Sequence, residues 1–383
     1  MNKIKVLHIL HAVGGVEVSV RLITENIDSE KIESVVLHGN KDTKISFFDD
    51  QKNPVRSYQA EISREINLIE DIKAIFQSFE IAKKEKPHLI HAHSAKGGII
   101  GKIIGEFLSI PVLHTPQAYS YLSAESKWKK VAFLQIENFF RLFRNKILAS
   151  SNSERNRAIN DVGYKPQNAL LFNNSIEPIE TIQTLSIEKT WPDNYICSVG
   201  RPSFQKNIEM MVEVIHEIKK SKPEIHLVLM GVGFHSPNLD KVRRKIKEFH
   251  LQKNITLLDW TKREDIFYII KNSMLYISTA RYEGLPYSII EALALKKACV
   301  VTDADGNRDL ISNNKNGFVI FDQNVNEFAD KILFLLDNET TRLKFEENAY
   351  KNFDANFNIY KTIRLLEEIY IENALPIKTG AKI

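Results

Sequence analysis

Two glutamates flank a short Gly-Leu-Pro loop in the second half of the chain. Glu283 and Glu291 are separated by seven residues, and Pro286 between them is typical of the first turn of a helix. The first backbone N–H groups of a helix have no partner within it and can bind an anionic or hydroxyl-rich ligand. The Glu291 carboxylate can accept hydrogen bonds from a diol such as a ribose, while Glu283 can reach another part of the same ligand. The pattern indicates a ligand site, and its alternative is an ordinary helix start with a surface glutamate.

A pair of cations follows another predicted strand in the same half. In SVGRPSFQKN, Arg201 follows the glycine that ends the strand, and Lys206 stands just before a helix that is predicted to begin near Asn207. A diphosphate leaving group carries several negative charges, which Arg can bind bidentately and Lys can neutralise as a point charge. These residues predict a diphosphate site, and the alternative is two exposed basic residues in a loop.

A pair of glycines follows the first predicted strand of the chain. Gly14 and Gly15 precede Glu17 and a predicted helix, and paired glycines let backbone N–H groups approach a phosphate closely. Gly-Gly turns are common after a first strand, so this motif gains weight only beside the other two.

The three motifs lie where short apolar runs give way to helical patterns. Runs such as KVLHIL, HLIHAH, YICSVG and MLYISTA alternate with helical stretches along nearly the whole sequence. This alternation is typical of βα units that form parallel sheets. It predicts an α/β fold of two Rossmann-like domains that face each other across a cleft, because open parallel sheets bind ligands beyond the carboxyl ends of their strands.

The boundary between the two domains is predicted near residues 175–192, where two prolines interrupt a segment without periodicity. The N-terminal Rossmann-like domain then covers residues 1–177, and the C-terminal one covers residues 193–355. Residues 356–383 carry apolar side chains at helical spacing, which predicts a helix that covers another surface.

Composition limits the class of protein. With 383 residues, of which 43% are hydrophobic and 26% charged, the chain is long enough for two cores and is typical of a soluble globular protein. The first residues are a poor signal peptide, and no apolar stretch approaches the roughly 20 residues that span a bilayer. The two cysteines, Cys197 and Cys299, lie in apolar strand candidates, which favours a reducing, cytoplasmic compartment. A net charge of +4 without a recognition motif argues against nucleic acid as a partner.

The order of the motifs is more specific than any one of them. A Gly-Gly turn, a hinge, a Gly-Arg pair with a following Lys, and two glutamates around Gly-Leu-Pro occur in that order over nearly the whole chain. In this the sequence resembles the family 4 retaining glycosyltransferases of the GT-B fold, also described as glycosyl transferases group 1. The resemblance implies a hexosyltransferase that uses a nucleotide diphosphate sugar, retains the anomeric configuration, and requires no metal ion or other cofactor.

The resemblance also implies roles for individual residues. Arg201 and Lys206 would hold the donor diphosphate, Glu291 the ribose hydroxyls, and Glu283 with Gly284, Leu285 and Pro286 the transferred sugar, while Gly14 and Gly15 would contact the phosphate from the other domain. Glu283, Arg201 and Lys206 are the predicted catalytic residues. The first domain would bind the acceptor, the second the donor nucleotide, and the C-terminal helix would return to the first domain.

The resemblance favours a UDP-sugar as donor, with a GDP-sugar as the alternative, and a saccharide or lipid-linked acceptor. It implies bacterial cell-surface polysaccharide, capsule or lipopolysaccharide biosynthesis, in the cytoplasm or in peripheral contact with the inner membrane. Two alternatives remain. One is a nucleotide-sugar epimerase of the same fold, which would need acid and base groups around C2 of the sugar. The other is a non-catalytic subunit that binds a nucleotide sugar for a partner transferase.

One position departs from the family pattern. Family members often carry a histidine where PVLHTPQAYSY has Gln117, and His114 lies three residues earlier, within the predicted strand. Glutamine keeps the hydrogen-bonding capacity of that position but cannot carry a proton charge, so the preference for acceptor or donor sugar is affected. His93 and Lys96, which follow the strand HLIHAH, are further predicted contacts of the acceptor or sugar, and a core histidine is the alternative for His93.

Three other patterns suggest metal or nicotinamide chemistry. Asp303 and Asp305 match the Asp-x-Asp of metal-dependent transferases, but they lie late in the second sheet. His91 and His93 point the same way on a strand, but the nearby sequence has no acidic or cysteine partner for a metal ion. Gly231-Val232-Gly233 begins a dinucleotide fingerprint, but Ser236 replaces the third glycine. No metal site and no nicotinamide cofactor are predicted.

A stretch of aromatic and basic residues occupies 126–146. Its apolar side chains at 128, 132, 136, 139 and 143 form a helical stripe, which predicts packing against the first sheet. The alternative is that the surplus aromatic residues and bases, such as Trp128 and Lys129, rest on an anionic membrane surface.

Overall fold

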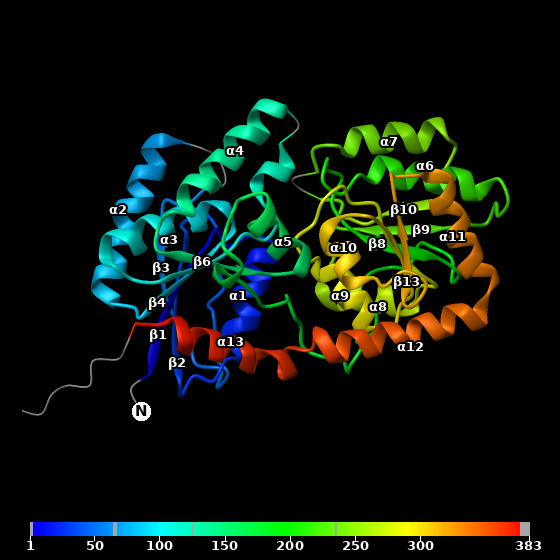
Figure 1. Cartoon of the computed structure of the whole chain (residues 1–383). Coiled ribbons are helices and arrows are strands. Elements are labelled where there is room, and N and C mark those ends of the chain that lie inside the picture. The colour runs from blue at the N-terminus through cyan, green and yellow to red at the C-terminus, as the bar shows by residue number, and fades with distance from the viewer. Residues whose placement is uncertain (1–2, 64–66, 125, 234–235, 376–383) are drawn as a thin grey trace, which may run out of the picture. The chain divides into compact units, whose positions relative to one another are not determined.

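The computed structural model describes residues 3–63, 67–124, 126–233 and 236–375. The chain divides into two compact units: unit 1 contains residues 1–177 and 359–383, and unit 2 contains residues 178–358. Each unit is built on a parallel sheet with helices on both faces (Figure 1). The predicted fold class, α/β with two Rossmann-like domains, is confirmed. The predicted hinge beyond residue 177 belongs to unit 2.

Unit 1 contains a seven-stranded parallel sheet in the order β3-β2-β1-β4-β5-β6-β7. The strands are β1 (Ile4–Ile9), β2 (Ile32–Gly39), β3 (Arg56–Ala60), β4 (Leu89–His93), β5 (Val112–Thr115), β6 (Asn145–Ala149) and β7 (Ala169–Leu171). The helices are α1 (Gly15–Asn26), α2 (Leu68–Glu85), α3 (Ser94–Leu108), α4 (Lys127–Phe140), α5 (Asn152–Asn160) and α13 (Ile359–Asn373), with short 3-10 turns at Ser120–Ser123 and Pro166–Asn168.

The two faces of this sheet pack against different helices. Leu7 and Ile9 of β1 share one core with Ile100 and Ile104 of α3, and α2 packs into the same core. His8, between them on β1, points to the opposite face, where its ring lies near that of Tyr370 on α13. Helix α1 contacts α13 on that face. The alternation along a single strand therefore separates an aliphatic core from a polar one.

Helix α13 is part of unit 1, although it follows all of unit 2 in sequence. Glu367 accepts a hydrogen bond from the backbone N–H of Asp28 at 3.0 Å, and Lys146 donates to Asn373 at 2.7 Å. The preceding helix ends at Asn356, so the segment that returns to unit 1 starts at Ile359 rather than at residue 356.

Unit 2 contains a six-stranded parallel sheet in the order β10-β9-β8-β11-β12-β13. Its strands are β8 (Ile196–Val199), β9 (Leu227–Met230), β10 (Ile255–Leu257), β11 (Tyr276–Ser278), β12 (Cys299–Thr302) and β13 (Gly317–Ile320). Its helices are α6 (Ile208–Lys219), α7 (Leu239–Glu248), α8 (Arg263–Asn272), α9 (Tyr287–Ala294), α10 (Asp305–Leu310), α11 (Val325–Asp337) and α12 (Glu339–Asn356). Aliphatic side chains of β8, β9, α6 and α11 contribute to one large core of this unit.

Two features of unit 1 differ from the sequence prediction. Strand β3 was missed because its sequence, RSYQA, is polar and largely exposed, as befits the edge of the sheet. The apolar stripe of α4 was wrongly assigned to the core. Trp128, Ile136 and Phe139 are exposed, and the helix instead packs through Phe133 and Leu134. Both sides of α4 carry apolar residues, so periodicity alone could not identify its inner face.

Candidate functional site

The strand order of unit 2 explains why two of the sequence motifs meet. Strands β8 and β11 are neighbours in the sheet, but the chain leaves them toward opposite edges, to β9 and to β12. Loops that follow such a pair diverge and open a crevice at the carboxyl ends of the strands. Gly200 and Arg201 come directly after β8, and the loop that leads to Glu283 comes after β11.

Backbone and hydroxyl contacts hold these two loops together. The buried hydroxyl of Thr279, which follows β11, donates to the carbonyl oxygen of Lys206 at 3.1 Å and that of Asn207 at 3.0 Å. The N–H of Arg281 donates to the carbonyl oxygen of Gln205 at 2.8 Å. Asn207 itself adopts a left-handed conformation, with φ of 50°, immediately before α6. The loop after β8 that contains Arg201 and Lys206, the cationic loop, is thereby fixed against the loop after β11 that contains Glu283, the glutamate loop.

An ion pair joins two of the three predicted catalytic residues. Lys206 Nζ lies 2.7 Å from Glu283 Oε1, and Gln205 Nε2 donates to Glu283 Oε2 at 3.2 Å. Glu283 is buried, and both of its carboxylate oxygens are paired within the protein. Arg201, two residues after the end of β8, is partly exposed in the same loop. Gln205 was not identified from the sequence, because a lone glutamine in a loop carries no signal.

The loop from Gly284 to Pro286 packs tightly before α9. Gly284 and Leu285 are buried, and Pro286 is the N-cap of the helix rather than its first residue. A Cβ atom on Gly306 of α10 would lie 2.4 Å from the carbonyl oxygen of Gly284, so α10 can approach this loop only because residue 306 is a glycine. The N-terminal N–H groups of α9 are thus held at the edge of the crevice.

Glu291 lies on α9, buried and paired with a residue that the sequence analysis missed. Arg263, the first residue of α8, places Nη2 3.1 Å from Glu291 Oε1. Burial raises the pKa of Glu291, and the Arg263 guanidinium opposes that rise. Arg263 follows the strand candidate ITLLDW, so the rule that selected Arg201, a cation just after a strand, could have found it.

The Gly-Gly motif lies in unit 1, beside the switch point of its sheet, which is the place where the strand order reverses between the neighbouring strands β1 and β4. Gly14 has φ of 62°, a left-handed conformation that suits glycine, and Gly15 begins α1. Asp42 braces the preceding residues. Its carboxylate accepts from the N–H of Ala12 at 2.5 Å and of Gly39 at 2.8 Å, and lies 2.6 Å from His11 Nδ1. Asp42 was not identified from the sequence.

The three predicted contacts of the acceptor or sugar also lie in unit 1. Lys96 on α3 pairs with Asp71 of α2. Gln117 and Ala118 both have positive φ, and the Ala118 N–H donates to Glu154 Oε1 at 2.8 Å. The other carboxylate oxygen of Glu154 accepts from the N–H of Ser150 at 2.7 Å, so this buried residue, also missed, holds the turns after β5 and β6 together.

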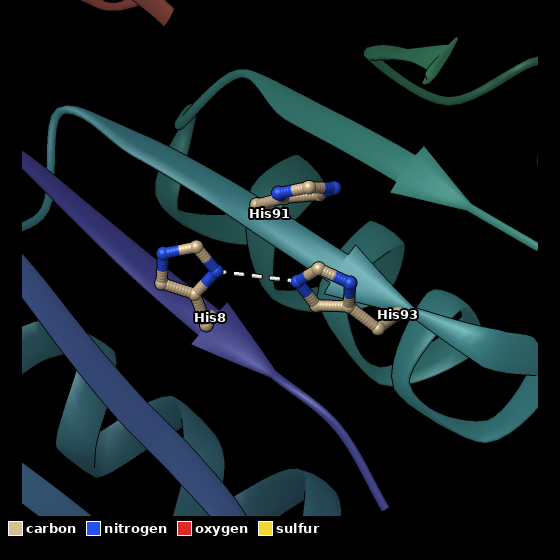
Figure 2. Close-up of side chains that lie close together, drawn as sticks. All are labelled: His8, His91 and His93. Carbon is tan, nitrogen blue, oxygen red and sulfur yellow. Dashed lines mark hydrogen bonds between the residues drawn. The ribbon is translucent and has the colours of Figure 1, made fainter. Parts of the chain in front are cut away.

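His93 is fully buried, so the alternative interpretation, a core histidine, describes its position. Figure 2 shows its ring beside His8, with His8 Nδ1 3.2 Å from His93 Nε2. His91 is adjacent, and one nitrogen from each of the three rings lies within 4.8 Å of the others. The sequence analysis found no partner for His91 and His93, because His8 is distant in sequence and joins them only through the pairing of β1 with β4.

Hydrogen bonds assign the tautomer of His91. The Thr115 hydroxyl donates to the carbonyl oxygen of Leu148 at 2.8 Å, so it accepts from His91 Nε2 at 2.9 Å. His91 Nδ1 then accepts from the Tyr370 hydroxyl at 2.6 Å. Both nitrogens are engaged, which does not suit a metal ligand. Among the described residues, His8 Nε2 and His93 Nδ1 have no hydrogen-bonding partner, whereas the outer nitrogen of a metal-binding histidine is usually hydrogen bonded.

Both carboxylates of the Asp-x-Asp motif are paired with one arginine, Arg308. Arg308 Nε lies 2.6 Å from Asp303, and Arg308 Nη1 lies 2.7 Å from Asp305. The guanidinium therefore satisfies both carboxylates in the place where a divalent cation would have to bind.

Two family models match the chain, one in each unit. Residues 13–178 match Glycosyltransferase Family 4, and residues 183–352 match Glycosyl transferases group 1. A search for membrane spans among the described helices found none that is sufficiently long and apolar.

Curated relatives extend over nearly the same length. The chain is 24% identical over 387 residues to the UDP-Gal:alpha-D-GlcNAc-diphosphoundecaprenol alpha-1,3-galactosyltransferase of Escherichia coli, covering 97% of each protein. It is 23% identical to the capsular polysaccharide biosynthesis glycosyltransferase CapM of Staphylococcus aureus, covering 81% of this chain and 83% of CapM.

Solved structures share the fold. Sucrose-phosphate synthase from Thermosynechococcus elongatus superimposes with a TM-score of 0.82 at 15% identity, covering 97% of this chain and 99% of that one. The HepE protein of Anabaena, in complex with UDP and glucose, gives a TM-score of 0.78 at 16% identity, covering 97% and 100%. With matching family models in both units and relatives that span its length, the chain belongs to the family 4 glycosyltransferases of the GT-B fold.

Proposed function

We propose that this glycosyltransferase is a retaining, metal-independent enzyme that transfers a sugar from a UDP-sugar to a lipid-linked saccharide. The reaction would take place in the cytoplasm, at the inner face of the membrane, during bacterial cell-surface polysaccharide biosynthesis. One observation carries the proposal. At the switch point of unit 2, the cationic loop after β8 and the glutamate loop after β11 meet through the ion pair of Lys206 with Glu283.

This pairing provides groups for the departing diphosphate. When the bond between the sugar and the diphosphate breaks, negative charge develops on the phosphate oxygens, and the Arg201 and Lys206 side chains would stabilise it. Lys206 would exchange its contact with Glu283 for one with phosphate, which leaves the Glu283 carboxylate to accept hydrogen bonds from sugar hydroxyls. Two cations provide the charge that a divalent metal ion supplies in other transferases, consistent with metal independence.

Retention would follow from attack on the face that the leaving group departs from. The acceptor hydroxyl forms the new bond at the anomeric carbon, and its proton passes to the departing phosphate oxygen. Acceptor contacts are assigned to unit 1, where Gln117 and Lys96 are partly exposed, while the buried His93 is assigned a supporting role.

The relatives support the choice of substrates. A relative that covers 97% of the chain uses UDP-galactose and a diphosphoundecaprenol-linked acceptor, and a structural neighbour was crystallised with UDP and glucose. The compared proteins are transferases, so neither the epimerase nor the non-catalytic subunit gains support from them.

The direct test combines donor, metal and product stereochemistry. Purified enzyme is incubated with UDP-galactose, UDP-glucose, UDP-N-acetylglucosamine or GDP-mannose and a short-chain lipid diphosphate saccharide, with either EDTA or magnesium. We expect transfer from one UDP-sugar at equal rates in both conditions, with an α-linked product detected by proton NMR. Activity that EDTA abolishes, a β-linked product, or conversion of the donor to its epimer would each contradict the proposal.

Arg263 provides a more specific prediction about the donor site. Replacing it with alanine removes the group that opposes the raised pKa of the buried Glu291 carboxyl. The pKa of Glu291 then rises further, so a larger fraction is protonated at mildly acidic pH and cannot accept two ribose hydrogen bonds. We expect the KM for the donor to increase by about tenfold, the loss of one charge-assisted contact, with the largest effect at pH 6 and the smallest at pH 8.

The matched variants for this prediction are Arg263→Lys and Arg243→Ala. Lysine keeps the positive charge and should restore most of the donor affinity, whereas the loss of Arg243, on helix α7, should not alter it. A KM for Arg263→Ala that is raised equally at every pH would show that the guanidinium does not act through the ionisation of Glu291.

A further inference from the structure

Helix α4 carries an apolar outer face that no other part of unit 1 covers in the described residues. Trp128 is 87% exposed, Val131 is 56% exposed and Phe139 is 57% exposed. At 100° per residue these three positions fall within about 80° of one another on the helix surface, so they form one strip along the same side of α4, with the exposed Gln135 among them. The inner face, through Phe133, Leu134 and Glu137, is the side that packs on the unit.

The strip extends across neighbouring elements. Leu142, in the turn after α4, is 70% exposed, and Phe107, near the end of α3, is 77% exposed. These two ends lie together because Glu106 accepts a hydrogen bond from the N–H of Arg144 at 2.8 Å. A gathering of exposed large apolar side chains on neighbouring elements is uncommon on a monomeric soluble protein and marks an interaction site.

Helix α2 also carries exposed apolar residues. It packs on α3 and carries exposed Ile69, Ile72 and Phe76 at helical spacing. Helices α2, α3 and α4 lie on the same face of the sheet. The core under α2 and α3 includes Ala92 of β4, and the core under α4 includes Ile147 of β6. Strand β5 lies between these two strands, and both residues are in register with its His114, so they face the same way. The outer sides of these helices therefore contribute to one face of unit 1.

The charges around the strip identify its partner. Lys127 and Lys129 flank Trp128 in sequence, which places one ammonium group on each side of the apolar strip. Lys130 is also exposed, whereas the one acidic residue of α4, Glu137, is buried against Lys102. Every exposed charged side chain of α4 is therefore a cation. An aromatic and aliphatic strip with lysines on both flanks fits the interface of an anionic bilayer, where the rings enter the headgroup region and the ammonium groups meet lipid phosphates.

We propose that the outer face of α4, with Trp128 and Phe139 as the inserting side chains and Lys127 and Lys129 as the headgroup contacts, docks this enzyme on an anionic membrane. The proposal rests on the proposed function, because a lipid-linked acceptor must be reached at the membrane surface. It adds the surface and the residues through which the enzyme does so. The buried pair of Lys102 with Glu137 fixes α4 to α3 and thereby sets the orientation of the face.

Vesicle binding tests the proposal directly. The full-length protein is mixed with vesicles of phosphatidylcholine containing 30% phosphatidylglycerol, or of phosphatidylcholine alone, and the bound fraction is measured by flotation. We expect binding to the anionic vesicles that weakens as salt is raised. Lys127→Gln with Lys129→Gln should reduce the partition coefficient by about 30-fold, since each lysine near an anionic surface contributes roughly a fivefold factor. Trp128→Ser with Phe139→Ser should reduce it at least as strongly.

A control variant and a fluorescence measurement distinguish insertion of Trp128 into the bilayer from nonspecific binding to vesicles. Trp260 of unit 2 is 84% exposed, close to the exposure of Trp128, and Trp260→Ser should leave vesicle binding unchanged. In that variant, the remaining tryptophans are the exposed Trp128 and the buried Trp191, so brominated lipids should quench the emission of Trp128. Unchanged partitioning of both double variants, or self-association of the protein through this face without vesicle binding, would overturn the proposal.

Donor binding distinguishes a failure of docking from a failure of the proposed function. Calorimetry with UDP-sugar is carried out on each variant, together with circular dichroism to confirm folding. Intact donor binding with lost vesicle binding supports the docking surface. If the wild type binds vesicles through these residues but transfers no sugar, the docking surface stands and the proposed function fails.

Discussion

Replacing Lys206 with alanine is expected to lower kcat by about 10²- to 10³-fold, the usual effect of removing a group that stabilises developing negative charge. The Lys206 ammonium lies 2.7 Å from Glu283 in a loop fixed by the Thr279 hydroxyl, so it is already in position before the donor binds. A preorganised charge of this kind stabilises the transition state more than the ground state. The KM for the donor should therefore change less than kcat, as measured by steady-state kinetics with the active UDP-sugar.

Lys220→Ala is the matched control for this prediction. Lys220 is also a unit 2 lysine in an ion pair, with Glu217, but it is exposed at the end of α6. Its loss should change neither kcat nor stability noticeably. A second variant, Lys206→Arg, keeps the charge but not the geometry and should recover only part of the rate. A kcat for Lys206→Ala within a factor of three of the wild type would remove Lys206 from the proposed mechanism.

Unit 1 is expected to lose most of its stability between pH 6.5 and pH 5. Burial lowers the pKa of His8 to about 3 and lowers the pKa of His91, His93 and His114 well below the ordinary value. The unfolded chain binds protons on these residues below about pH 6.5, while the folded unit keeps them neutral. Acidification therefore stabilises the unfolded state, and the stability that is present above pH 6.5 is lost as the pH falls.

The magnitude of this effect is large. Each histidine that stays neutral in the folded state lowers the free energy of unfolding by about 2 kcal/mol at pH 5. Four such histidines together approach the total stability of a typical domain. Tyr370 and Thr115 contact His91 as neutral hydroxyls, and Lys102 lies near His114, so the surrounding groups offer a proton on these rings no compensating negative charge. Urea unfolding followed by circular dichroism at pH 7.5, 6.5 and 5.5 measures the loss.

His8→Leu tests the assignment to this cluster. Leucine takes up no proton on unfolding, so the dependence of the unfolding free energy on pH should fall by about one quarter of the slope. His250→Asn is the control, because His250 is exposed and its left-handed backbone, with φ of 54°, is compatible with asparagine. A slope that is the same in His8→Leu and the wild type would show that the buried histidines do not govern the acid sensitivity.

The sequence predicted the strands that form the two sheets far better than the contacts between their ends. Apolar runs such as YICSVG report burial on both faces of a strand, and this signal is local. The polar edge strand β3 lacks it. The prediction that Arg201, Lys206 and Glu283 share one end of one sheet used only the rule that parallel strands end at the same edge, and the structure places Lys206 against Glu283.

The residues that were missed depend on long-range pairing. Arg263 and Glu291 lie on different helices, and Asp42 reaches the β1–α1 loop from the turn after β2. His8 joins His91 only through strand pairing. A single sequence contains the side-chain types for such contacts, but not the strand order that brings them together. The exposed stripe of α4 was misassigned for a related reason, since helical periodicity shows that a face is apolar but not what lies against it.

Unit 1 is built from two segments of the chain that are translated at different times. Its last helix, α13, leaves the ribosome only after the whole of unit 2 has been translated, yet the Tyr370 hydroxyl of that helix completes the hydrogen bonding of His91. A nascent chain that already holds β1 and β4 therefore exposes one face of the first sheet until α13 has been translated. Helix α13 acts as a closing element, so a chain truncated before residue 359 would leave the polar core of unit 1 open to water.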